Sequence, residues 1–378
     1  RGAPGIDRIQ YVYYTDNDAS IQALRAGDID FISGLTPQQY SALEGEEGIT
    51  TSSGQGRRYS SVAINPGQVT RDGEPYGNHN PALEDVNVRQ AIRQGIDIQA
   101  LLDGSAVRAV NFSGGMHHAF ADRASGFCVY NDCAVGIHRL LEGGVSRVLY
   151  LDVDGHHGDG TQSIFWDDPR VMTISLHETG AALFPGTGFA TELGGEQAEG
   201  TAVNIALPPM SDDAQWLRAY FAVVPQLIEQ FRPEVIVSQH GCDSHFQDEL
   251  THLKVSVDAQ REIMMDVARQ ADRWCEGRWI ATGGGGYDCY DAVPRSWTHL
   301  VAVATGDPIG LARPVPEAWR DHIREAYGTD PHPSMGDDVD LWWRSWEVGF
   351  DPDDPTDRVV MATRRAVFPL WGLDPWYD

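Results

Sequence analysis

The chain has 378 residues, and its 55 acidic side chains against 28 lysines and arginines give a formal charge of -27. This balance argues against binding to nucleic acid or anchoring on anionic membranes, and no apolar run approaches the roughly 18 residues that a spanning helix needs. Five cysteines without a C-x-x-C pattern suit a reducing compartment. No signal peptide opens the chain, which begins with arginine, so we expect a cytoplasmic protein with a processed terminus or a fragment.

The first hundred residues have an α/β pattern in which apolar runs alternate with helical periodicity. A glycine at position 27 is placed to end one of the predicted helices. This segment contains no cluster of histidines, cysteines and carboxylates at metal-ligand spacing. Strands are predicted at residues 9–14, 29–32 and 59–64, and helices at residues 19–26, 37–43 and 86–102.

The rest of the chain is predicted to form a parallel sheet with helices between its strands. Its strand candidates are short apolar runs without alternation, as is typical of strands buried on both faces. Strands are predicted at residues 107–112, 148–152, 171–177, 235–239 and 279–282, and helices follow Gly126 as far as Leu141 and cover residues 214–231 and 259–274.

Several of these strands end in polar residues of a kind that binds metal. Asp154 and His156 follow the central strand two positions apart, so their side chains point the same way on extended backbone. Asp243 follows another strand and is the natural third ligand, and one imidazole with carboxylates suits zinc or a similar divalent metal. The plainer alternative is an Asp/Gly loop whose acids cap the next helix, for which Asp159 is placed.

Three further strand ends carry residues suited to proton transfer and substrate contact. His117 and His118 are adjacent and suit a pair of acid/base groups, each held by its own carboxylate, and Asp152 and Asp159 are placed to orient histidines. Tyr287 follows four glycines that leave the backbone free to turn. Together with an open metal site, these residues are the components of metal-assisted amide hydrolysis. Phe184, in a Pro/Gly loop, is either a substrate wall or a loop aromatic packed on the core.

The motifs G-G-M-H-H, G-F-C, D-V-D-G-H-H-G-D-G, L-F-P-G-T-G, G-C-D and G-G-G-G-Y resemble those of the zinc-dependent histone deacetylase family, especially its bacterial acetoin-utilization branch. The resemblance covers residues 106 to about 310 closely and extends into the Trp-rich tail. It implies an arginase/deacetylase-like parallel sheet with helices on both faces. It also implies hydrolysis of the acetyl amide of a lysine side chain in a protein, or of a similar small acetylated amine.

The resemblance assigns a role to each residue of the predicted site. Zinc ligands would be Asp154, His156 and Asp243; catalytic residues would be His117 paired with Asp152, His118 paired with Asp159, and Tyr287; substrate-binding residues would be Gly126, Phe127, Phe184 and Gly285. His118 would take the proton of the attacking water, and His117 or His118 would protonate the leaving amine. The family also implies a structural potassium ion near the Asp152 and Asp154 backbone and the Ser175 side chain.

Residues 5–104 resemble a different family, the solute-binding proteins of peptide-import ABC transporters. The words that match are A-L-R-A-G-D-I-D, V-A-I-N and N-P-A-L-E-D-V-N-V-R-Q-A-I, in that order. Histone deacetylase relatives carry roughly a hundred other residues at this place. We therefore expect two domains, a solute-binding-protein fragment at residues 1–105 and a deacetylase-like domain at residues 106–378, joined by a fusion. The strand at residues 107–112 would then be an apolar sheet edge.

Three alternatives stay open at this stage. A dinuclear arginase-type ureohydrolase has the same fold but typically needs a D-x-H-x-D pattern, and Gly158 stands where its second acid belongs. Residues 1–105 alone suggest a solute-binding module, although most of the ligand-enclosing lobes are missing. The third alternative is a catalytically inactive chimera that has every catalytic residue but no stable site.

Overall fold

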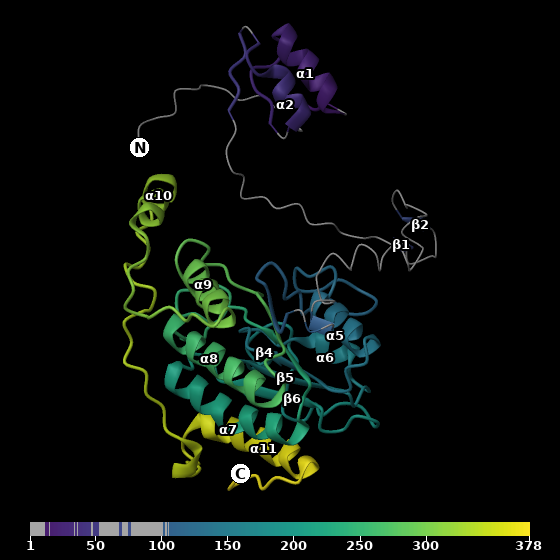
Figure 1. The fold of residues 1–378 in the computed structure, drawn as a ribbon, viewed down its shortest axis with the longest axis vertical. Helices are drawn as coiled ribbons and strands as arrows, with labels where there is room; N and C mark the ends of the chain where they lie inside the picture. The colour runs from purple at the N-terminus through teal and green to yellow at the C-terminus, as the bar shows by residue number, and fades with distance from the viewer. Residues whose placement is uncertain are drawn as a thin grey trace. The chain divides into compact units, whose positions relative to one another are not determined.

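The computed structural model describes residues 12–14, 16–33, 35, 37–46, 48–52, 68–69, 75–76, 101–102, 104 and 106–378. The chain divides into two compact units, Arg1–Val62 and Ala63–Asp378 (Figure 1). The second unit contains the parallel sheet. A two-residue antiparallel pair, β1 (Gln68–Val69) and β2 (Pro75–Tyr76), belongs to it as well.

The described part of the first unit has two helices, α1 (Asn17–Ala26) and α2 (Pro37–Leu43). The side chain of Asp16 accepts the Ala19 N–H at the start of α1, and Gly27 ends it in the left-handed conformation with φ 78°. Both helices were predicted, and both are confirmed.

The strand predictions in the first unit are not borne out where they can be examined. Residues 29–32 form no strand, and Phe31 is 80% exposed. Since a strand needs a neighbour to satisfy its backbone groups, this apolar run remains irregular among the described residues. Residues 12–14 form no strand either. The predicted strand at residues 59–64, and the helix at residues 86–102 apart from its last two residues, lie outside the described part of the chain.

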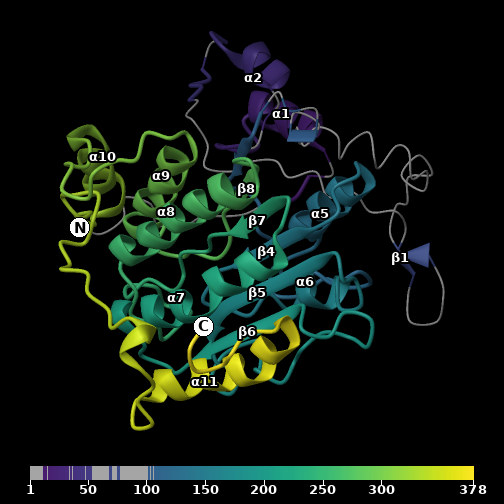
Figure 2. The same ribbon diagram turned by 60° about the horizontal axis from the view of Figure 1, so that its bottom comes forward.

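The second unit is built on a six-stranded sheet in which every pairing is parallel. Figure 2 shows strands from both halves of this sheet side by side. In spatial order the strands are β3 (Arg108–Asn111), β8 (Trp279–Thr282), β7 (Val235–Gln239), β4 (Val148–Asp152), β5 (Val171–Glu178) and β6 (Ala202–Leu207). All five predicted strands are confirmed, and β6 was missed. Among the described residues β3 pairs with β8 alone, so it forms one edge.

Helices cover both faces of the sheet, as the fold prediction required (Figure 2). Leu149 and Leu151 of β4 face one apolar core, whereas Val148 and Tyr150 face the other. The first core is covered by α7 (Asp213–Phe231), α8 (Val257–Trp274), α9 (Ala292–Ala304) and α11 (Pro355–Val367), and the second by α5 (Asp132–Glu142) and the residues around α6 (Asp159–Ile164). Two-sided burial explains why β4 has apolar side chains on both faces.

The C-terminal tail is tied to α7 by a buried ion pair. It includes the short helices η2 (Trp346–Val348) and η3 (Phe368–Trp371) and follows α10 (Glu317–Tyr327). Arg218 of α7 donates to both carboxylate oxygens of Asp357, through Nη2 at 2.7 Å and through Nε. It also donates to the carbonyls of Arg344, Ser345 and Gly349. This one guanidinium therefore holds the turn at residues 344–349 of the tail.

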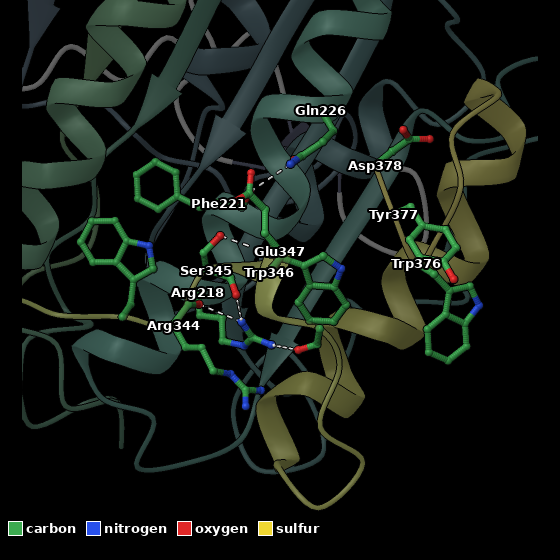
Figure 3. A pocket seen from close by; sticks show the side chains of 12 residues that line it. Arg218, Phe221, Gln226, Arg344, Ser345, Trp346, Glu347, Trp376, Tyr377 and Asp378 are labelled. Carbon is green, nitrogen blue, oxygen red and sulfur yellow. Dashed lines mark hydrogen bonds between the residues drawn. The ribbon is translucent and has the colours of Figure 1, made fainter.

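A cavity of about 590 Å³ lies beside this ion pair. In Figure 3, Phe221 stands on one side of it, and Trp376 and Tyr377 on the other; Trp343 lines the cavity as well. The rings of Phe221 and Trp343 are stacked, with centroids 5.1 Å apart. The tail thus packs on α7 through aromatic contacts around a buried charge pair.

We predict that Asp357→Ala lowers the free energy of unfolding by ~3–5 kcal/mol, because it leaves the Arg218 guanidinium buried without its carboxylate. Urea unfolding measures the change. The matched control is Glu317→Ala, which breaks an ion pair whose carboxylate is 62% exposed and should cost ~0–1 kcal/mol. Equal losses in the two variants would contradict the prediction.

A second prediction concerns His299 of α9, which is fully buried and hydrogen-bonded through Nε2 to the Met335 carbonyl at 3.1 Å. Burial lowers the pKa of His299 to about 4. Between that value and its ordinary pKa of 6.5, the unfolded chain binds the extra proton, so stability falls as pH falls. In urea unfolding from pH 7 to pH 4.5, His299→Asn should flatten this slope by at most ~1.4 kcal/mol per pH unit. An unchanged slope would refute this.

Candidate active site

The three residues predicted as metal ligands come together at the carboxyl ends of β4 and β7. Asp154 and His156 follow β4 and Asp243 follows β7, and their ligand atoms all lie within 4.8 Å of one another. The His156 Nδ1 atom is 2.8 Å from Asp243 Oδ2 and 3.3 Å from Asp154 Oδ1. All three side chains are buried. Neighbouring parallel strands therefore place two carboxylates and one imidazole around a single point.

The orientation of both carboxylates is fixed by hydrogen bonds from the surrounding backbone and from β7. Asp154 Oδ2 accepts from Gln239 Nε2 at 2.7 Å and from the Gly285 N–H at 2.8 Å. Asp243 Oδ1 accepts from the Gly155 N–H at 2.7 Å. These contacts occupy one oxygen of each carboxylate and leave the other directed toward His156.

The electrostatics of this cluster favour a cation. Burial raises the pKa of Asp243 to about 7, and the charge of neighbouring Asp154 adds to the rise. Burial alone would lower the pKa of His156, but its hydrogen bonds to Asp154 and Asp243 raise it to about 11. A positive charge between the two carboxylates is therefore stabilised. Two oxygens and one nitrogen fit a divalent metal such as zinc, which catalytic sites hold with three protein ligands and an open position.

The paired histidines lie beside this cluster, each against the carboxylate that was predicted for it. His117 Nδ1 is 2.8 Å from Asp152 Oδ2, and His118 Nδ1 is 2.7 Å from Asp159 Oδ1. The two imidazole rings are 4.0 Å apart between centroids. Since each Nδ1 is occupied by a carboxylate, Nε2 is the nitrogen left for proton exchange with a substrate.

The two histidines differ in their preferred protonation state. Burial works against a charge on His117, but Asp152 and Asp154 outweigh it and raise the pKa of His117 to about 9. Burial lowers the pKa of His118, and the adjacent charge of His117 lowers it further. One ring is therefore positive and the other neutral near pH 7, which is the separation of pKa values that acid/base catalysis uses.

Exposed aromatic side chains stand at the mouth of the site. Phe127 is 85% exposed, Phe184 49% and Tyr287 42%. The Phe184 ring meets the His118 ring edge-on at 5.0 Å, and the Phe127 and Tyr287 rings are 6.4 Å apart. Phe184 is thus an exposed residue beside a site histidine, rather than a loop aromatic buried in the core.

The two glycines predicted to bind substrate lie where a side chain has no room. A Cβ atom at Gly126 would fall 2.2 Å from the His118 ring, and one at Gly285 would fall 2.1 Å from Asp243 Oδ2. Both glycines therefore permit the backbone to approach the site closely.

Some residues that build the site were not identified from the sequence. Asp132 accepts the N–H groups of Gly115 and Met116, and Asn131 donates to the carbonyls of His117 and Ala119. Gln239, the last residue of β7, holds Asp154. Their position directly after a motif or at a strand end was the available signal, but which backbone group each one meets depends on the tertiary fold. Asp159 is the first residue of α6 and not its N-cap, which is Gly158, although Asp159 Oδ1 accepts the Gly160 N–H at 2.9 Å.

Comparison with known proteins gives the same picture. The histone deacetylase domain model matches residues 88–304, so the chain belongs to the histone deacetylase family. It is 40% identical over 254 residues to the acetoin utilization protein AcuC of Bacillus subtilis, covering 66% of this chain and 65% of that protein. AcuC of Staphylococcus xylosus is 39% identical over 58% of this chain and 57% of its own. The chain thus spans somewhat less than two thirds of these relatives.

Solved structures agree with the fold. The chain is similar to the crystal structure of a histone deacetylase homolog from Aquifex aeolicus, with a TM-score of 0.60, 30% identity and 73% of each chain covered. It is also similar to the HD domain of HDA15, with a TM-score of 0.52, 28% identity, and coverage of 57% of this chain and 61% of that one.

The N-terminal part matches a second family model. The middle region of the family 5 bacterial extracellular solute-binding proteins matches residues 1–126, which overlaps the deacetylase match. The predicted resemblance to this family is therefore confirmed, while the domain boundary near residue 105 stays a prediction. In the part of the chain that is described, no helix is long and apolar enough to cross a membrane.

We predict that Gly285→Ala weakens binding of a divalent metal, with zinc as the probe, by ~10–100-fold, because the new methyl group pushes against Asp243 Oδ2 and Asp154 Oδ2. Competition with a chromogenic chelator measures the affinity. Gly310→Ala is the matched control, since a Cβ there meets no atom within 4 Å. Equal metal affinity in the two variants would contradict the prediction, because it would mean that the glycine-rich loop accommodates the methyl group without disturbing the ligands.

Proposed function

We propose that this chain is a zinc-dependent deacetylase that hydrolyses the acetyl amide of acetyl-lysine or of a similar acetylated amine. One observation carries the proposal, namely that two carboxylates and an imidazole converge beside two His–Asp pairs and a tyrosine at one end of a parallel sheet. Membership of the histone deacetylase family supports it. The AcuC relatives support assignment to the acetoin-utilization branch.

In this proposal Asp154, His156 and Asp243 hold the metal. Zinc, when bound, supplies Lewis acidity to water and to the acyl carbonyl. His118 is neutral near pH 7, and its Nδ1 is held by Asp159, so its Nε2 accepts the proton of the attacking water. His117 stays positive beside Asp152 and stabilises the negative charge that develops. His117 or His118 then gives a proton to the nitrogen of the leaving amine.

Tyr287 serves as a hydrogen-bond donor. Burial and the charges of Asp243 and Asp154 raise the pKa of Tyr287 above its ordinary value, so its hydroxyl keeps its proton. A protonated phenol donates to the oxyanion that forms as the acyl carbon becomes tetrahedral. This contact is stronger in the transition state than with the neutral substrate, which is what accelerates the reaction.

The rim suggests how the substrate is held. Phe127 and Phe184 provide two exposed aromatic faces for the aliphatic stem of a lysine side chain. The formal charge of -27 favours the approach of cationic substrates. Cys128, Cys133, Cys242 and Cys275 are buried thiols, which suits the proposed cytoplasmic location.

Two further predictions concern the number of metals in the site and a structural potassium ion. A ureohydrolase of arginase type needs a second metal, whereas the described residues contain one group of metal-ligating side chains, which favours the mononuclear alternative. The structural potassium ion near Asp152 and Ser175 also stays a prediction; these two residues are register partners across β4 and β5, and the Ser175 hydroxyl is 2.8 Å from His177 Nδ1.

The deciding experiment is turnover of a fluorogenic acetyl-lysine peptide by the full chain, with zinc measured on the same sample and an acetylated polyamine assayed in parallel. We expect about one zinc per chain, and a loss of ~10²-fold or more in kcat for Tyr287→Phe and for His118→Ala.

Two control variants accompany this assay. Tyr290→Phe changes a tyrosine that stacks on Tyr327, and His138→Ala changes a histidine that packs on Phe165, so both should retain activity. Metal-free and inactive protein would contradict the proposal and favour the alternative of a catalytically inactive chimera. Zinc without turnover would contradict the assigned catalytic roles.

A further inference from the structure

We propose that Asp248 is a positioning residue that holds Tyr287 at the metal site by accepting its backbone N–H. The inference rests on the proposed function, in which the Tyr287 hydroxyl donates to the substrate. Asp248 lies in the loop between β7 and α8, five positions after the metal-ligating Asp243. Its Oδ2 atom accepts the Tyr287 N–H at 2.8 Å.

Tyr287 needs an external anchor, because its side chain is not fixed by packing. It is 42% exposed, and the ring nearest to it belongs to Phe127, which is itself 85% exposed. Four glycines precede it, so the backbone that carries it has far more conformational freedom than an ordinary loop. The position of the hydroxyl is therefore decided by where the backbone of residue 287 is held.

The loop is held at two points on either side of Gly286. Before it, the Gly285 N–H donates to Asp154 Oδ2 at 2.8 Å, and the Gly285 carbonyl accepts the Cys242 N–H at 2.7 Å. After it, the hydrogen bond to Asp248 fixes Tyr287. The next contacts along the chain are at Asp288, whose carboxylate accepts the Asp291 and Ala292 N–H groups at the start of α9. Without the Asp248 contact, Gly286 and Tyr287 lie between Gly285 and Asp288, and the tyrosine has more freedom to turn on the glycine.

Asp248 is built as a rigid acceptor. It is 7% exposed, and its Oδ1 atom accepts the Leu250 N–H at 2.9 Å, so both oxygens are engaged by backbone donors. Its own N–H donates to the His245 carbonyl at 2.9 Å. The described residues give it no ion pair. Burying a carboxylate in this way costs free energy. In return, the carboxylate joins the Tyr287 loop to the loop that carries Asp243.

The expected effect on turnover follows from geometry. A displacement of ~1 Å in a group that contacts the reacting atoms can reduce the rate by roughly 100-fold. Asp248 itself touches neither substrate nor metal in this scheme, so its removal should act only through Tyr287. This separates a positioning role from a general contribution to stability.

The kinetic test compares Asp248→Ala, Tyr287→Phe and the double variant, with zinc content measured for each. We expect Asp248→Ala to lower kcat by ~10–100-fold with KM nearly unchanged, and to cause little further loss in the Tyr287→Phe background. Asp248→Asn keeps one acceptor oxygen and should be intermediate. If the loss in kcat of the double variant equalled the product of the two single losses, the proposal would be overturned. A change in KM alone, with kcat unchanged, would overturn it as well.

Asp213→Ala is the matched control. This carboxylate accepts the Ser256 N–H at 2.6 Å and the Ser256 hydroxyl at 2.7 Å, and neither residue belongs to the proposed site. It should change stability without lowering kcat. If Asp248→Ala does not fold, the comparison passes to Asp248→Asn, for which the same outcomes apply.

Hydrogen exchange of the Tyr287 amide in the metal-free chain gives a readout that does not depend on activity. Exchange in peptides covering residues 284–291 should become roughly tenfold faster in Asp248→Ala and stay unchanged in Asp213→Ala. Faster exchange in a chain whose parent shows no turnover would support the anchor and refute the proposed function. Unchanged exchange would overturn the anchor whatever the turnover.

Discussion

The contact between two buried carboxylates is the constraint on which the site depends. Asp154 and Asp243 come from adjacent parallel strands and share His156 between them. Two negative charges at this separation and depth are unfavourable unless a cation or protons neutralise them. Backbone and amide N–H groups hold the oxygens in place, so the protein carries the cost of the arrangement in its folded state. The paired histidines and the glycine-rich loop are placed relative to this fixed centre.

Local sequence determined much of the fold because the strands of the second unit are buried on both faces. Val235, Ile236 and Val237 of β7 are all apolar and buried, a run without alternation that is typical of central parallel strands. The same reasoning failed at residues 29–32, where an apolar run has no neighbouring strand and stays irregular. It also missed β6, which contains Asn204 and two alanines and is recognised as a strand only through its pairing with β5.

The sequence singled out site residues whose chemistry is unusual and missed those that support them. Adjacent histidines and a D-x-H pattern at strand ends are rare enough to stand out, and the structure brings them together. Gln239 and Asp248 are ordinary polar residues whose significance lies in the backbone or carboxylate group they meet. That partner is set by tertiary contacts between residues 39 and 85 positions apart, which periodicity and spacing do not encode.

The hydrogen bond from the Gly285 N–H to Asp154 Oδ2 joins the glycine-rich loop directly to one of the residues proposed to bind the metal. If an ion draws Asp154 into its coordination shell and this stiffens the loop, thermodynamic linkage requires that anything that stiffens the loop tightens the ion by the same factor. A substrate that orders the tyrosine would then also retain the metal. Such reciprocity would make the resting enzyme the form most vulnerable to chelation and the working enzyme the most resistant.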